Sequence, residues 1–346
     1  YRCDPSQTLT FSGYWYYDGT SIAPPDGDYQ VKVKRSGVQK GSTDITLASG
    51  AFSISDVTAE ATVGSYSYTI EATYMFGAGS FSAVIVDRVK VIGYSVSDSR
   101  ANINDDVNTD ATLKYEYDNT AVTDGSVTIN GVSATHQGSG VWRITQSKST
   151  VQAATYNTVA ASGNAHGITT VNQNSQSVTV VWDRLEVYGY STSDDRADVG
   201  YNVEYRWQLR YDYDDVIFDN TKGSVTIGGV SATWDAVNSR WYRSVTLPST
   251  PQSYSQALGF TDNTYGLTVI TGTTSQSVIA DRLELWWVGF DDSRVNVGAT
   301  VEVRFKVRYD YDDVVFDDTK GVLNIEGGSA TWDVANGWWK RSIVQS

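Results

Sequence analysis

The feature that most constrains the fold of this 346-residue chain is that its sequence repeats itself. The dipeptide Asp-Arg, followed by an apolar stretch, occurs at Asp87-Arg88, Asp183-Arg184 and Asp281-Arg282, at intervals of 96 and 98 residues. Residues 183–248 align with residues 281–346 without a gap, and 34 of the 66 positions are identical. A period of this length is that of a complete small domain, so the sequence predicts tandem domains rather than one large core.

The period divides the chain into four domains, which we call repeats one to four: 1–86, 87–182, 183–280 and 281–346. Aligning Tyr17 with Tyr213 places Tyr1 opposite Ala197, so we expect repeat one to lack its first strand. Repeat four ends before the counterparts of Gly266–Ile270 and Ser275–Ala280, so we expect it to lack its last strands. No linker rich in Gly, Ser or Pro separates the repeats, and the Asp-Arg joints are therefore predicted to be short and stiff.

Apolar residues recur at every second position within a repeat, which predicts a half-buried antiparallel strand of ten or more residues. In repeat three the residues predicted to face the core are Val203, Tyr205, Trp207, Leu209, Tyr211 and Tyr213. The same pattern ends at Tyr117 in repeat two and at Tyr311 in repeat four.

Further strands and turns follow this strand, at SVTIGG, in a hairpin at SATWDAVNSRWYRSV and at two late strands. Short strands punctuated by turns in units of about 97 residues predict an all-β fold, a tandem array of immunoglobulin-like antiparallel β-sandwich domains. No segment of the sequence predicts a helix. Strands of 10–12 residues are about 35–40 Å long, and with stiff joints we expect a rod-like array.

Charge and hydropathy exclude several classes of partner. The formal net charge of −14 argues against nucleic acid, because proteins that bind a phosphate backbone present a basic face. No apolar run approaches the ~20 residues of a membrane-spanning helix, so we expect no membrane span in this segment.

An acidic segment occurs twice, as YDYDDVIFDNTKG at Tyr211–Gly223 and as YDYDDVVFDDTKG at Tyr309–Gly321. One interpretation is a calcium site, because calcium prefers several carboxylate oxygens. Its ligands would be Asp212, Asp214 and Asp219 in repeat three and Asp310, Asp312 and Asp317 in repeat four. The other interpretation is a solvent-facing strand and its turn, since two carboxylates about 6.6 Å apart repel each other only weakly in water.

Repeat two favours the structural interpretation of these acids. Its segment is two residues shorter and keeps only Glu116, Asp118 and Asp124 as acids. A site needed for chemistry should persist between neighbouring copies, so we expect no catalytic residues and no cofactor, with calcium as the one alternative. The chain also contains no GxSxG, HExxH or phosphate-loop motif, and we predict that it is not an enzyme.

Tryptophans recur around the hairpin of successive repeats, at Trp234, Trp241, Trp332, Trp338 and Trp339. Core packing is the favoured interpretation, and platforms on which sugars stack are the alternative.

The stretches DRLEVYGYSTSDDR, GSVTIGGVSATWD and SQSVIADR give the chain a family resemblance. Over repeats two to four it resembles the immunoglobulin-like repeats of large archaeal extracellular and surface-layer-type proteins. The resemblance implies an extracellular or cell-surface location and a role in stalks, sheaths, adhesins or filaments, and it supplies no active-site motif. The chain has no Asn-x-Ser/Thr sequon, which favours a bare filament or stalk over a glycosylated surface layer.

These observations together predict an extracellular structural protein, a stiff sandwich rod in a filament, sheath or surface array. An adhesin or carbohydrate-binding array, or an accessory region of a larger secreted enzyme, are the alternatives. The predicted partners are other copies of the chain, which would add strands to the incomplete terminal repeats, and cell-surface proteins or glycans. The alternative to strand addition is that the chain is a fragment of a longer one. In repeat four, this prediction expects the inner faces of Val303, Phe305 and Val307 to be uncovered.

Overall fold

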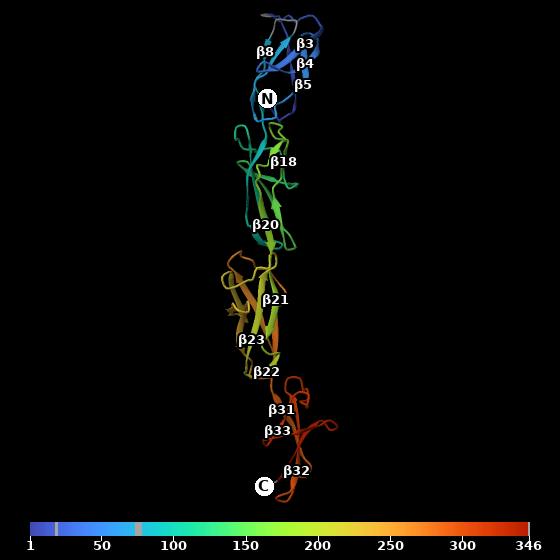
Figure 1. Ribbon diagram of the computed structural model, residues 1–346, viewed down its shortest axis with the longest axis vertical. Helices are drawn as coiled ribbons and strands as arrows, with labels where there is room; N and C mark the ends of the chain where they lie inside the picture. Colours follow the sequence, from blue (N-terminus) through green and yellow to red (C-terminus); the bar gives the residue numbers. More distant parts are fainter. Residues whose placement is uncertain (18–19, 73–77, 345–346) are drawn as a thin grey trace. The chain divides into compact units, whose positions relative to one another are not determined.

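The computed structural model describes residues 1–17, 20–72 and 78–344, and over these residues it contains β-strands and no helix (Figure 1). None of them therefore lies in a helix that could span a membrane. The chain divides into two compact units, Tyr1–Trp182 and Asp183–Ser346. The prediction of an all-β chain of tandem immunoglobulin-like sandwiches is confirmed.

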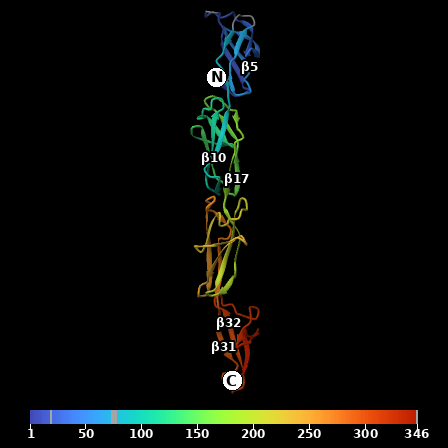
Figure 2. The same ribbon diagram turned by 60° about the vertical axis from the view of Figure 1, so that its left-hand side comes forward.

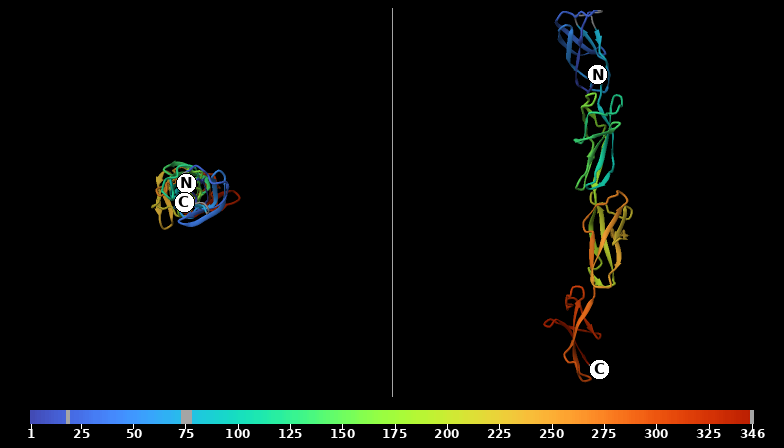
Figure 3. Two further views of the ribbon diagram at one scale, coloured as in Figure 1. Left: turned by 90° about the horizontal axis from the view of Figure 1, so that it is seen from above. Right: turned by 180° about the vertical axis from the view of Figure 1, so that it is seen from behind.

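Repeat three is the yellow to orange part of the right-hand view in Figure 3. It is a β-sandwich of two five-stranded sheets, with strand orders β26-β27-β23-β21-β29 and β22-β30-β28-β24-β25. Antiparallel pairs dominate, and β21 pairs in parallel with β29 as β22 does with β30. The strands are β21 (Leu185–Thr192), β22 (Arg196–Asp198), β23 (Asn202–Tyr211), β24 (Gly223–Ile227), β25 (Val230–Ser231), β26 (Thr233–Asp235), β27 (Arg240–Thr246), β28 (Gln252–Asp262), β29 (Ile270–Thr271) and β30 (Ser275–Asp281).

The core of repeat three follows the alternation of β23. All five alternate residues of that strand from Val203 to Tyr211 are fully buried between the two sheets. The buried polar atoms have partners: the Trp207 indole N–H donates to the Thr273 carbonyl at 2.9 Å, and the Tyr211 hydroxyl donates to the Asp262 carboxylate at 3.0 Å. The prediction that Tyr213 also faces the core was wrong. The strand β23 ends at Tyr211, and the turn that follows leaves Tyr213 44% exposed. Tyr117 and Tyr311 are exposed for the same reason.

Repeat two has the same first sheet, in the order β15-β16-β12-β10-β19, and its second layer is formed by two three-stranded sheets, β11-β20-β17 and β14-β13-β18. Its strands are β10 (Val89–Val96), β11 (Arg100–Asn102), β12 (Val107–Tyr115), β13 (Ser126–Ile129), β14 (Val132–Ser133), β15 (Thr135–Gly138), β16 (Val141–Gln146), β17 (Gln152–Tyr156), β18 (Val159–Ser162), β19 (Val171–Asn172) and β20 (Val178–Asp183).

Repeat one departs from this plan, with sheets β1-β9-β6, β2-β5 and β4-β3-β7-β8. Its β1 pairs in parallel with β9, as β22 does with β30, and β1 begins at Arg2 as β22 begins at Arg196. This pairing places Tyr1 opposite Asp195, two residues away from the Ala197 that the sequence alignment gave. The strands are β1 (Arg2–Cys3), β2 (Thr8–Tyr14), β3 (Gly27–Arg35), β4 (Val38–Leu47), β5 (Ala51–Thr58), β6 (Gly64–Tyr66), β7 (Thr69–Ala72), β8 (Ala78–Ser80) and β9 (Val84–Val86).

Repeat four contains one four-stranded sheet, β31-β32-β36-β35, and the small pair β33-β34. Figure 2 shows β31 beside β32. The strands are β31 (Leu283–Phe290), β32 (Thr300–Tyr309), β33 (Asn324–Ile325), β34 (Gly328–Ser329), β35 (Thr331–Asp333) and β36 (Trp338–Val344).

The prediction about the inner face of repeat four was wrong in its residues. Val303 and Val307 are only 6% and 4% exposed and Phe305 is half-buried. Val307 packs in one cluster with Phe316 and Trp339, and Phe305 and Leu323 pack against this cluster. The uncovered side chains lie on β31 instead, where Leu283 is 45% and Leu285 is 52% exposed. Their counterparts in repeat three, Leu185 and Val187, are 0% and 8% exposed.

Candidate functional site

The same set of side-chain contacts recurs at two joints between neighbouring repeats. Within the first unit, the guanidinium of Arg2 in repeat one reaches into repeat two. It donates a hydrogen bond to the Asp118 carboxylate, and its Nη1 lies 3.3 Å from Asp87 Oδ2. Its Cζ lies 5.2 Å from the centre of the Tyr115 ring, within cation–π range. We call this arrangement the joint clamp.

Within the second unit, Arg196 of repeat three makes the same contacts with repeat four. Its Nη1 donates to Asp281 Oδ2 at 2.9 Å, its Nη2 donates to the Asp312 carboxylate, and its Cζ lies 4.7 Å from the centre of the Tyr309 ring. Asp312 and Tyr309 are the counterparts of Asp118 and Tyr115, so the clamp is a repeated feature of the two described joints.

The Asp-Arg dipeptide at each joint fixes the strand that follows. Asp87, Asp183 and Asp281 are 0%, 0% and 3% exposed. Each accepts a hydrogen bond from the backbone N–H of the exposed tyrosine 30 residues later, Tyr117, Tyr213 or Tyr311. These aspartates therefore tie the start of each repeat to the end of β12, β23 or β32, the strand whose alternate residues face the core.

The arginines of the same dipeptides bind the acidic segment. Arg88 pairs with Glu116 at 2.9 Å, Arg184 with Asp212 at 2.7 Å, and Arg282 with Asp310 at 2.7 Å. The structure thus brings together two groups of residues, the joints and the acids, that the sequence analysis treated separately.

Electrostatics within the clamp act in opposite directions on its two carboxyls. Burial raises the pKa of Asp87 above its usual value, against hydrogen bonds from the Tyr117 and Arg88 N–H groups. Burial also acts to raise the pKa of Asp118, but hydrogen bonds from Thr120 and Arg2 outweigh it and hold that pKa at about 2. In the second unit, the hydrogen bond from Arg196 lowers the pKa of Asp312.

The remaining acids of the segment form the turn itself. Asp219 accepts hydrogen bonds from the N–H and hydroxyl of Thr221 and from Lys222, and Asp317 does so from Thr319 and Lys320. Asp214 accepts from the Val216 N–H at 3.4 Å. No three His, Cys, Asp or Glu side chains of the described residues gather as metal ligands, so the geometry offers the predicted calcium site no support.

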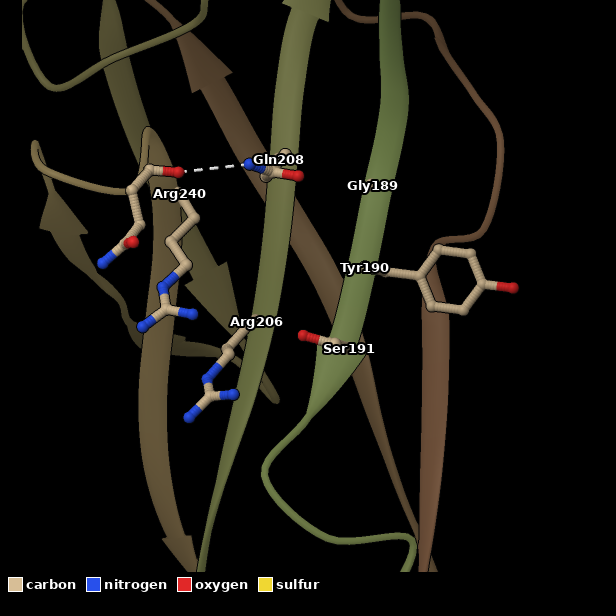
Figure 4. A pocket seen from close by; sticks show the side chains of 7 residues that line it. Gly189, Tyr190, Ser191, Arg206, Gln208 and Arg240 are labelled. Carbon is tan, nitrogen blue, oxygen red and sulfur yellow. Dashed lines mark hydrogen bonds between the residues drawn. The ribbon is translucent and has the colours of Figure 1, made fainter.

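A shallow cavity of ≈ 280 Å³ lies on the outer face of the first sheet of repeat three. Figure 4 shows Arg206 and Arg240 pointing to the same side of it, while the Tyr190 ring points away. Arg206 pairs with Glu204 and Arg240 with Asp235, and Gln208 donates to the Asn238 carbonyl at 3.1 Å. These groups can hydrogen-bond a polar ligand. The cavity is lined by Gly189, Tyr190, Ser191, Arg206, Gln208, Asn238 and Arg240.

The tryptophans divide into three groups. Trp241 and Trp339 are core residues, 3% and 2% exposed, and Trp234 and Trp332 pack half-buried against them. Trp338 lies on the outer face of its sheet, where it stacks on Trp287. Core packing therefore accounts for four of the five tryptophans considered from the sequence.

Sequence reasoning missed the role of the clamp arginines. Arg2, Arg100, Arg196 and Arg294 recur at intervals of 98, 96 and 98 residues, which marks them as part of the repeat. That spacing was a usable signal, but the partner acids lie more than 80 residues away, and only the fold shows which of them the guanidinium reaches.

Comparison with known proteins gives no family for the chain: no family model and no curated protein matches it. Among solved structures it is similar to FdeC, an Escherichia coli adhesin, with 16% identity, 75% of this chain and 87% of that chain covered, and a TM-score of 0.30. It is similar to invasin, a bacterial integrin-binding protein, with 12% identity, coverage of 99% and 72%, and a TM-score of 0.33. It is also similar to an I-band fragment of titin, with 11% identity, 81% of this chain and 93% of that chain covered, and a TM-score of 0.33. These likenesses are remote, and the fold is defined by the strand pairing of the chain itself.

Proposed function

We propose that this chain is an extracellular structural protein whose sandwich repeats form a stiff rod within a filament, sheath or surface array. The observation that carries the proposal is the joint clamp, which recurs with the same residue types at two joints. A protein whose task is mechanical needs its joints, rather than any pocket, to be specified by the sequence.

The clamp opposes bending because a hinge at the joint would have to break several contacts at once. At the first joint these include the Arg2 contacts and backbone hydrogen bonds such as Asp87 N–H to the Cys3 carbonyl at 2.9 Å. Asp4 adds to them, since it accepts hydrogen bonds from the N–H groups of Thr169 and Thr170. A hydrogen bond to a charged group contributes about 1.5–3 kcal/mol, or less where water reaches it, so the clamp favours one joint geometry.

Small-angle X-ray scattering of the full chain tests the proposal. Four repeats of roughly 35–40 Å predict a maximum dimension of about 150 Å with little spread. Arg196→Gln removes the charge of one clamp and should shorten and broaden the distance distribution. The matched control is Arg143→Gln, which breaks an ion pair with Asp110 inside repeat two and should leave the distribution unchanged. A compact or broadly distributed wild type would overturn the proposal.

Strand addition between copies is our proposal for assembly. Among the described residues β31 pairs only with β32, whereas its counterparts β10 and β21 also pair in parallel with β19 and β29 on their other edge. A segment of another copy with the pattern of Ile270–Thr271 would complete this edge and cover Leu283 and Leu285. The absence of an enzymatic activity is likewise proposed, on the grounds that the recurring acids have structural partners.

A further inference from the structure

Several of the differences between repeats three and four fall on one spot of the outer sheet face. Where repeat three has Tyr188, Gly189, Gln208 and Arg240, repeat four has Trp286, Trp287, Lys306 and Trp338. In repeat three this spot holds the cavity of Figure 4. In repeat four it holds three indoles and a lysine, which we call the indole–lysine cluster.

The register of three strands builds this cluster. Trp287 of β31 lies opposite Lys306 of β32, and Trp338 comes from the adjacent strand β36. The rings of Trp287 and Trp338 are stacked, with centroids 5.7 Å apart and planes at 16°. The Lys306 ammonium lies 5.5, 5.9 and 5.8 Å from the ring centres of Trp286, Trp287 and Trp338, within cation–π range of all three.

Core packing does not explain these indoles. Trp286 is 45% and Trp287 is 36% exposed, and the core position of this hairpin is taken by Trp339. The indole N–H of Trp338 is buried and has no hydrogen-bond acceptor among the described residues. Exposed aromatic side chains gathered in one place are costly in water and mark interaction surfaces.

The charges around the cluster favour an anionic partner. The neighbouring cations Arg304, Arg308 and Lys340 pair with Glu302, Glu284 and Asp333. Within the described part of the chain, no carboxylate lies within ion-pair distance of Lys306, whose charge therefore faces only the rings and the solvent. An anion bound above the indoles would give the Lys306 ammonium a partner of opposite charge.

We propose that the indole–lysine cluster binds an acidic polysaccharide, a chain of sugar rings that carries carboxylate or sulfate groups. The exposed indoles offer flat surfaces for the C–H faces of sugar rings, and Lys306 pairs with the anionic group. This inference goes beyond the structural function proposed above, because it gives the array a ligand and does not depend on the stiffness of the joints.

Titration of the full chain with three polymers tests the proposal, with tryptophan fluorescence and calorimetry as readouts. Polygalacturonate supplies carboxylates, dextran sulfate supplies sulfates, and dextran is the uncharged reference. We expect binding to at least one charged polymer, weaker binding to dextran, and a loss of affinity as salt is raised. The two charged polymers distinguish the anionic group. Failure of both charged polymers to bind would overturn the proposal.

Variants that install the residue of repeat three provide the matched comparison. Trp287→Gly and Trp338→Arg should each weaken binding of the charged polymer about tenfold or more, the effect of losing roughly 1.4 kcal/mol. Lys306→Gln should remove the preference for the charged polymer over dextran. Tyr190→Ala removes an exposed aromatic ring of repeat three that lies outside the cluster. This variant is the control and should bind as the wild type does.

Near-ultraviolet circular dichroism establishes that each variant is folded, and Lys306→Gln keeps the test decisive if a tryptophan variant is not. Unchanged affinity in folded Trp287→Gly and Lys306→Gln would overturn the proposal. So would sedimentation showing that the cluster holds a second copy of the chain, as a dimer that these substitutions dissociate without any glycan present.

Discussion

At the scale of single residues, Arg2 and Arg196 fill one role in two different surroundings. The Arg2 side chain is 11% exposed and packs near Tyr115 and Tyr117, whereas that of Arg196 is 29% exposed. The receiving acids differ accordingly: the pKa of Asp118 is held at about 2, and that of Asp312 is lowered by its hydrogen bond from Arg196. A guanidinium suits this position because it can serve two carboxylates and an aromatic ring at the same time.

The depressed pKa of Asp118 leads to a prediction about pH. Its folded pKa of about 2 lies below the value near 3.9 of an unfolded chain. Asp118 therefore stabilises the fold above pH ~4, and this contribution is lost as pH falls from ~4 to ~2. Carboxyl NMR titration of Arg2→Gln should show the Asp118 pKa shifted up towards 3.9, only in part, because Thr120 still donates. An unshifted pKa in this variant would show that Arg2 does not hold the carboxylate.

At the scale of elements, the strands that alternate strictly could be predicted and the others could not. The prediction of β23 was correct as far as Tyr211, because a strand with one buried face has apolar residues at every second position of its sequence. The 11-residue strand β28 was missed, since its burial does not alternate and serines and glutamine interrupt its apolar residues. Of the late strand predicted at Gly266–Ile270, only Ile270 lies in a strand, the two-residue β29.

The candidate site could likewise be predicted from the sequence only in part. The Asp-Arg joints were visible as a repeat, but their partners at Glu116, Asp212 and Asp310 follow from the pairing of β10, β21 and β31 with the long inner strands. Such contacts between residues 28 positions apart depend on register, which a short motif does not contain.

The acidic turn carries a prediction about calcium. Because Asp212, Asp219, Asp310 and Asp317 each have an arginine or lysine partner, the turn does not need a metal to balance its charge. We expect the thermal midpoint to stay within about 1 °C when calcium is added or removed by a chelator, since a ligand that does not bind the folded state cannot shift it. A rise that saturates with calcium, and that Asp219→Asn abolishes, would instead support the calcium site.

At the scale of the whole molecule, the repeats differ in how much core they contain. The core of repeat three joins residues of both five-stranded sheets, and its largest buried side chains include Trp207, Tyr205 and Tyr211. In repeat four the buried cluster contains only Val307, Phe316 and Trp339, and three further apolar residues are buried outside it, Val301, Val303 and Ile325. One sequence pattern therefore supports domains of unequal stability, and local opening should be concentrated in repeat four.

Hydrogen exchange of the full chain tests this inequality with an internal control, because β32 and β23 occupy equivalent positions. Half-exposing two leucine side chains forgoes about 2 kcal/mol of burial, so we expect β32 amides to exchange roughly tenfold or more faster than those of β23. If another copy adds strands to β31, protection of β31 and β32 should rise with protein concentration while that of β23 stays constant. Equal exchange of the two strands at every concentration would contradict both the inequality and strand addition, because repeat four would then be closed by its own residues.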